Sequence, residues 1–198
     1  MNIDLVFRLI VLAVLLFAFG ISASYRKKAR DEGGVIERKE EGWPALVLRM
    51  VFALPLLAVL LLNISYPRFV TWSKIDIPLY LRIIGLVIAV SCVPLIWWVF
   101  HSIGNFVSET ILTKDNHQLF TSGPYRRVRH PLYASTLLLL FSISLVFGDW
   151  IVFGYTLAGV IAFRLLVIPA EEERLLDSFG EDYESYQSRT GTLLPWIR

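Results

Sequence analysis

Cysteine is nearly absent from this chain of 198 residues, and charged residues are scarce. The single cysteine, Cys92, lies inside an apolar run, which excludes the disulfide scaffold of a small secreted protein. Only 18% of the residues are charged, whereas soluble domains carry about a quarter. The net charge of +2 is too small to predict nucleic-acid binding. Hydrophobic residues make up 56% and gather in long runs, which is typical of a polytopic membrane protein.

Five apolar runs have about the length that a helix needs to cross a hydrocarbon core roughly 30 Å thick. They cover residues 5–24, 45–64, 79–100, 132–147 and 151–168. The predicted fold class is therefore all-α, a polytopic integral membrane protein with about five transmembrane helices. Basic residues follow the first run instead of preceding it, so we expect a retained helix and not a signal peptide. Pro131 fits the first position of the fourth helix, and Gly148 fits its end. The last two runs are separated by three residues, which predicts a tight antiparallel hairpin.

Lysine and arginine counts predict the orientation of these spans. Thirteen of them lie in the first loop, the third loop and the C-terminal tail, against two on the opposite side. We therefore expect an integral protein of the inner or plasma membrane, if the source is prokaryotic. Its N-terminus would lie outside, and its third loop and C-terminus would face the cytoplasm. One domain is predicted over residues 1–198, with three spans in 1–100 and a loop, the hairpin and a C-terminal segment in 101–198.

The polar side chains gather at one predicted surface. The hairpin begins at Pro131 and returns to Pro169, so residues 129–133 and 169–173 should be neighbours at the cytoplasmic side. The helix start after Arg129 and His130 favours an anion. Glu171, Glu172 and Glu173 opposite it favour a cation, so this pocket suits a zwitterion. Each feature also has a simpler interpretation. The arginines could anchor the chain at lipid phosphates, and His130 could be a helix cap. The glutamates could be a solvated helix start, and Tyr125 and Tyr133 could be interfacial aromatics.

Other kinds of site find little support in the sequence. The three histidines lack the spacing of a helical metal pair, so no metal site is predicted. The serine elbow of common hydrolases is absent. Arg164 lies deep in the fifth run, seven residues before Glu171 and therefore on the same helical face. An intramembrane arginine is a functional candidate.

The stretch from His117 to Tyr133, HQLFTSGPYRRVRHPLY, resembles a signature of the isoprenylcysteine carboxyl methyltransferase family and its phospholipid methyltransferase relatives. The same order continues with an apolar hairpin, the glutamates of PAEEERLL, the segment FGEDYESY and a terminal Leu-Pro. The resemblance covers about residues 101–198 and also suits the five-span count of small prokaryotic members.

This resemblance implies an integral-membrane methyltransferase that uses S-adenosyl-L-methionine and releases S-adenosyl-L-homocysteine. It implies a cofactor pocket on the cytosolic side, built by the third loop and the C-terminal segment. The cofactor's methionyl part is a zwitterion, as the pocket requires. The implied cofactor-binding residues are His117, Gln118 and Leu119 on the adenine side, Tyr125, Arg129, His130 and Tyr133 towards the middle and amino-acid end, and Glu171 and Glu172 on the polar groups.

The expected acceptor is a lipophilic molecule held among membrane lipids. Carboxyl-methylating relatives often carry an arginine about four residues before the glutamate pair, where this chain has Val167. Arg164, one helical turn earlier, is the candidate catalytic residue that would orient an anionic acceptor. An isoprenylcysteine-type carboxylate is favoured. N-methylation of a phospholipid amine and a non-enzymatic membrane carrier or assembly protein are the alternatives.

Overall fold

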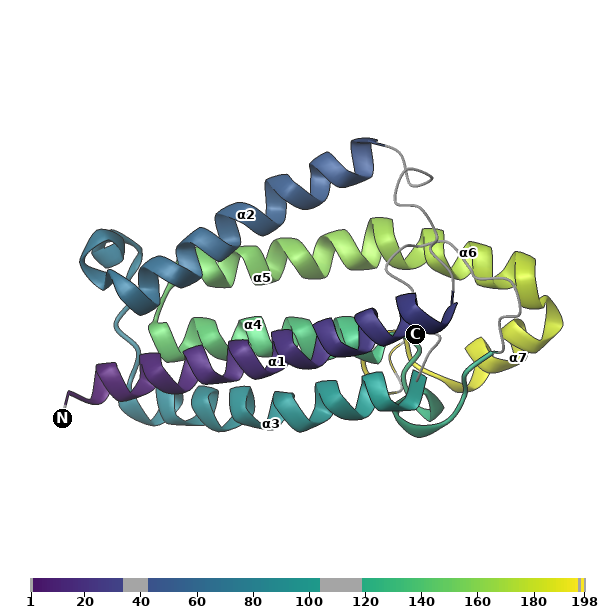
Figure 1. Cartoon of the computed structure of the whole chain (residues 1–198), viewed down its shortest axis with the longest axis horizontal. Helices are drawn as coiled ribbons and strands as arrows, with labels where there is room; N and C mark the ends of the chain where they lie inside the picture. Colours follow the sequence, from purple (N-terminus) through teal and green to yellow (C-terminus); the bar gives the residue numbers. More distant parts are fainter. Residues whose placement is uncertain (1, 34–42, 104–118, 196, 198) are drawn as a thin grey trace.

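The structure is a computed structural model that describes residues 2–33, 43–103, 119–195 and 197. Over these ranges the chain is helical, with three isolated bridges as its extended pairings. Long helices lie side by side, and the N-terminus and the C-terminal helices α6 and α7 are at opposite ends (Figure 1). The predicted all-α fold class is thus confirmed for the described residues.

The first three helices are longer than the apolar runs that predicted them. Helix α1 covers Ile3–Gly33, so it extends beyond the apolar part and carries the basic cluster at its C-terminal end. Helix α2 covers Trp43–Ser65 and contains Pro55, and a bend of 116° separates it from the 3₁₀ segment η2, Pro67–Ser73. Helix α3 covers Leu79–Ile103.

The predicted hairpin is formed by α4, Pro131–Phe147, and by α5, Trp150–Ala162. As expected, Pro131 occupies the first helical positions, and Gly148 ends α4 with φ +58°. A side chain at Gly148 would meet the carbonyl oxygen of Ile75 at 2.5 Å, so this turn requires glycine. Helix α4 packs mainly against α3, where Gly85 brings the two backbones close together.

The helix of the fifth apolar run does not end before Pro169 as predicted. A π-helical turn, η5, covers Phe163–Val167 and leads directly into α6, Ile168–Phe179. Proline normally breaks a helix because its ring meets the carbonyl four residues earlier, but here it stands in the first turn of the segment that follows the π turn. Gly180 then separates α6 from α7, Glu181–Arg189.

Three helices of the described chain are long and apolar enough to cross a membrane: α1, α3 and the continuous unit of residues 150–179. The number of candidate spans rises to four if the bent pair of α2 and η2 is counted as one span. Helix α4 is a shorter apolar helix of 17 residues. Exposed apolar side chains cover the outside of the bundle, as a lipid-facing surface requires. The chain is accordingly an integral membrane protein, and three to four candidate spans replace the predicted five.

A buried polar cluster closes the end of the bundle away from α6 and α7. The Asp149 carboxylate caps α5 by accepting from the backbone N–H groups of Ile151 and Val152. Its other oxygen accepts from Asn63 Nδ2 at 2.9 Å and from Ser73 Oγ at 2.7 Å. Lys74 Nζ lies 3.8 Å from the same oxygen. The cluster therefore joins α2 and η2 to the hairpin turn.

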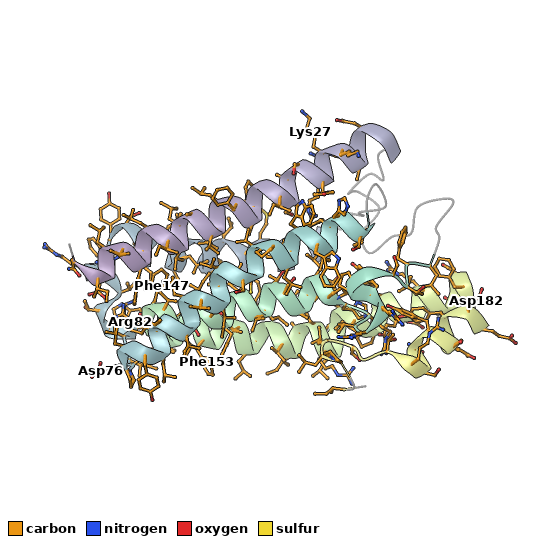
Figure 2. All side chains as sticks on the ribbon, turned by 90° about the horizontal axis from the view of Figure 1, so that it is seen from below. Lys27, Asp76, Arg82, Phe147, Phe153 and Asp182 are labelled. Atoms are coloured by element: carbon orange, nitrogen blue, oxygen red, sulfur yellow. The ribbon has the colours of Figure 1, made fainter. Side chains whose placement is uncertain are left out.

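A second polar link lies at this end of the bundle. Arg82 donates to the backbone oxygen of Val146 at 2.9 Å and to the Asp4 carboxylate at 2.7 Å. Its guanidinium also stands 5.0 Å from the centre of the Phe7 ring. Figure 2 shows Arg82 and Phe147 near this end and Asp182 of α7 at the other. This link joins α1 and α3 to the end of α4.

Candidate functional site

The residues before α4 and those of α6 meet through a charged group that we call the clasp: Arg129, His130 and Glu172. Arg129 Nε donates to Glu172 Oε1 at 2.7 Å, and His130 Nε2 lies 3.1 Å from the same oxygen. Gln187 of α7 donates to the second Glu172 oxygen at 3.1 Å. His130 is buried, and only 7% of the Arg129 side chain is exposed. The ion pair of Arg129 and Glu172 in the clasp is thus largely dehydrated, and the attraction between its charges is stronger than in a surface pair of the same residues.

The Arg129 guanidinium also holds the C-terminal segment. It donates to the backbone oxygens of Gln187 and Thr190, at 3.3 and 2.6 Å, and to Thr192 Oγ1 at 3.0 Å. Backbone hydrogen bonds join residues 127–130 to residues 191–192 in parallel. Arg129, one of the implied cofactor-binding residues, therefore has its Nε, NH1 and NH2 groups donating to protein atoms and joins the C-terminal segment to the bundle.

Beside the clasp lies a stack of aromatic rings capped by a carboxylate. The rings of His130 and Tyr133 are stacked with centroids 5.6 Å apart, and Phe163 stacks on Tyr133 at 4.4 Å. The Tyr133 hydroxyl donates to Glu171 Oε2 at 3.0 Å, and His130 Nδ1 lies 3.6 Å from that oxygen. About a third of the Glu171 side chain, 32%, is exposed. Aromatic faces next to a partly exposed carboxylate favour a cationic ligand.

Three tyrosines lie near the clasp, Tyr125 before α4 and Tyr183 and Tyr186 in α7. The Tyr186 hydroxyl donates to the backbone oxygen of Tyr125 at 2.7 Å and so fixes η4, Gly123–Arg126. Burial raises the pKa of Tyr186 to about 12, and burial also raises the pKa values of Tyr125 and Tyr183, so all three are neutral at physiological pH. The Tyr183 side chain is fully buried, and its hydroxyl has no hydrogen-bond partner among the described residues.

Arg164 lies in the π turn immediately after Phe163 and is exposed. Its predicted place on the Glu171 face assumed an uninterrupted α-helix, whereas the π turn changes the angle between these positions. Phe163 belongs to the aromatic stack, so Arg164 directly follows a residue of the stack in the chain. A π turn of this kind is frequent at functional sites.

The structure brings together most of the residues that the sequence singled out. Tyr125, Arg129, His130, Tyr133, Glu171 and Glu172 share one end of the bundle through the contacts above. Leu119 is described and partly buried, whereas His117 and Gln118 lie outside the described residues. Sequence reasoning missed Phe163, Gln187, Thr190 and Thr192, which nothing local marked. The segment FGEDYESY, part of the resemblance, contains Tyr183 and Tyr186, but neither was assigned a role.

Residues 83–177 match the model of the isoprenylcysteine carboxyl methyltransferase family. A protein-S-isoprenylcysteine O-methyltransferase of Xenopus laevis is 38% identical over 87 residues, which are 42% of this chain and 29% of that protein. Methanethiol S-methyltransferase 1 of Bradyrhizobium diazoefficiens is 32% identical over 75 residues, which are 37% of this chain and 25% of that protein. The chain therefore spans only about a quarter of the length of these relatives.

A solved structure shows the same fold. The eukaryotic intramembrane Ras methyltransferase, an isoprenylcysteine carboxyl methyltransferase, superposes with a TM-score of 0.52 at 24% identity. The match covers 82% of this chain and 55% of the solved one. At this identity the likeness concerns the fold, and the resemblance to the family depends on the sequence matches. Together they confirm the predicted resemblance, and residues 83–177 carry the sequence pattern of the isoprenylcysteine carboxyl methyltransferase family.

Proposed function

We propose that the chain transfers a methyl group from S-adenosyl-L-methionine to a lipophilic acceptor held in the membrane. The observation that carries this proposal is the aromatic stack of His130, Tyr133 and Phe163 beside the Glu171 carboxylate. The matched family and the relatives named as methyltransferases support the same reaction type. The bound cofactor would supply an activated methyl on a sulfonium.

The described residues fit such a cofactor. Its ammonium and its sulfonium are cations, and Glu171 offers a partly exposed carboxylate next to aromatic faces. The first turn of α4 directs its positive dipole end to the same place, which suits the methionyl carboxylate. The buried Tyr183 hydroxyl is a further donor without a partner among the described residues at this end.

The protein's task in this reaction is positioning. Methyl transfer from a sulfonium is an in-line displacement, and alignment of the two reactants can supply roughly 7–11 kcal/mol. Glu172 and Arg129 hold His130 and the C-terminal segment in place, so they act on the cofactor site indirectly. Arg164, exposed on the π turn, would orient the acceptor's anionic head group.

A binding measurement tests the cofactor assignment. We expect the detergent-purified protein to bind S-adenosyl-L-homocysteine in calorimetry, and Glu171→Gln to weaken binding about tenfold or more, because a hydrogen bond to a charged group is lost. Glu173→Gln is the matched control, since Glu173 is an exposed neighbour on the same helix. A folded wild-type protein that binds no S-adenosyl-L-homocysteine contradicts the proposed function, and equal loss in both variants contradicts the role of Glu171.

An acceptor assay tests the substrate class. With methyl-labelled cofactor we expect transfer to an S-prenylated cysteine with a free carboxylate, and none to its amide. Arg164→Gln should lower kcat/KM about tenfold or more by removing a charged contact, while S-adenosyl-L-homocysteine binding stays unchanged. Labelling of phosphatidylethanolamine or methanethiol in place of the prenylated cysteine would assign a different acceptor. Neither the amine nor a non-enzymatic carrier role is favoured by the family and relatives found.

A further inference from the structure

The segment η2 has one buried and one exposed face. Val70 and Ser73 are buried against the bundle, at 3% and 0% exposure. Phe69 and Trp72 point outwards and are 71% and 66% exposed. The segment follows the 116° bend after α2 and therefore runs across the end of the bundle instead of continuing along it (Figure 1).

Neighbouring elements extend the exposed face of η2 into a larger surface. Tyr66, at the bend, is 63% exposed, and its ring lies 6.3 Å from Phe69. Trp150, the first residue of α5, is 48% exposed and meets Trp72 edge-on with centroids 6.0 Å apart. We call these four residues, Tyr66, Phe69, Trp72 and Trp150, the aromatic rim.

The rim is a fixed part of the fold. Ser73, at the end of η2, donates to the fully buried Asp149 carboxylate, and the Ile75 N–H donates to the Gly148 oxygen at 2.7 Å. Lys74 adds a hydrogen bond to the Phe147 oxygen at 3.0 Å. These bonds join the C-terminal end of η2, next to Trp72, to the turn before Trp150, so the buried polar cluster fixes this end of the exposed face.

The charges around the rim indicate which environment covers it. Arg68 is exposed and directly precedes Phe69, and Asp76 is exposed just beyond the segment. Four exposed aromatic rings are unfavourable in bulk water, and two exposed charges are unfavourable in hydrocarbon. Tyrosine and tryptophan at a level that also holds charges are typical of the headgroup interface, where a cation can reach lipid phosphates.

We propose that the aromatic rim lies in the headgroup interface of one leaflet, with Arg68 at the lipid phosphates, at the end of the bundle opposite the candidate site. The rim then fixes the depth of the protein in the bilayer. This inference depends on the membrane location and not on the proposed methyl transfer, because none of its residues belongs to the candidate site.

Depth-dependent fluorescence quenching tests this proposal. Trp72 is left as the only tryptophan by replacing the others with phenylalanine: Trp43, Trp97, Trp98, Trp150 and Trp196. The variant is placed in phosphatidylcholine bilayers whose acyl chains are brominated near the carbonyl end or near the methyl end. We expect stronger quenching of Trp72 by the carbonyl-end bromines. Val87→Trp with Trp72→Phe is the matched control, because Val87 is exposed in the middle of α3 and should give the opposite order.

Three results would overturn the proposal. Stronger quenching of Trp72 by methyl-end bromines would place the rim in the hydrocarbon core, and quenching by aqueous iodide without bromine quenching would place it in water. Loss of bromine quenching at high protein-to-lipid ratio, restored on dilution with lipid, would indicate a second copy as the occupant. If the single-tryptophan protein does not fold, the quenching of Trp72 is obtained as the difference in bromine quenching between the native chain and Trp72→Phe.

Discussion

Replacing Arg129 with glutamine should release the C-terminal segment from the end of the bundle and abolish S-adenosyl-L-homocysteine binding. The guanidinium joins Glu172 to two backbone oxygens and to Thr192 while being largely buried. Its loss leaves the Glu172 carboxylate dehydrated beside His130, with Gln187 as the other polar contact. Breaking a buried pair of this kind costs about 3–5 kcal/mol.

Hydrogen exchange separates this effect from global unfolding. The amides of His130 and Gly191, which pair the two segments, should exchange roughly 100-fold faster or more in Arg129→Gln, since each 1.4 kcal/mol is about a factor of ten. Amides in the middle of α3 should keep their protection. Arg129→Lys should resemble the glutamine variant more than the wild type, because an ammonium lacks the planar fork that spans these acceptors.

The exposed Arg126 supplies the control for charge alone. Arg126→Gln removes the same charge from the same loop and should leave both the exchange of Gly191 and the binding unchanged. Slow exchange at Gly191 in Arg129→Gln would show that the backbone pairing alone holds the segment, and the proposed role of Arg129 would then be wrong.

Replacing Asp149 with alanine should have the largest effect on stability at the opposite end. The variant loses the cap on α5 and the acceptor for Asn63 and Ser73, and it leaves Lys74 without its carboxylate. A lost cap costs about 1 kcal/mol, and an unpaired charge in a buried pair costs about 3–5 kcal/mol. We therefore expect a much lower melting temperature in detergent.

Two further variants divide this loss into its parts. Asp149→Asn keeps a capping oxygen but removes the charge, so it should lie between alanine and the wild type. Adding Lys74→Met to Asp149→Asn should recover part of the loss, because the partly buried cation without its carboxylate is then gone. Asp76→Asn, an exposed carboxylate at the same end, should melt like the wild type. Equal melting of Asp149→Ala and Asp76→Asn would contradict the stabilising role of the cluster.

The sequence predicted best those features that depend on neighbouring residues. Pro131 and Gly148 marked the ends of α4 correctly because proline and left-handed glycine have strong local preferences. The hairpin then predicted which distant residues meet, and the contacts of Glu171 and Glu172 agree with it. Apolar length was a weaker guide, since it did not show that α2 would bend after Ser65.

Features that depend on distant partners were not predictable in the same way. Proline at 169 indicated a helix end, yet a π turn before it lets the helical path continue. Asp149 was predicted only as part of the hairpin turn, and its role in joining Asn63 and Ser73 depends on tertiary packing. The protein acceptors of Arg129 lie 43 to 63 residues later in the chain, so its role in holding the C-terminal segment had no local signal.

Helix α4 has a consequence for the bilayer itself. Its 17 residues span only about 25 Å at 1.5 Å per residue, less than the hydrocarbon thickness of roughly 30 Å. Polar groups stand at both of its ends, the clasp at one and Asp149 at the other. A bilayer that matches the length of this helix is thinned around the protein. With the proposed function, a lipophilic acceptor would meet the water-soluble cofactor in this thinned part of the bilayer.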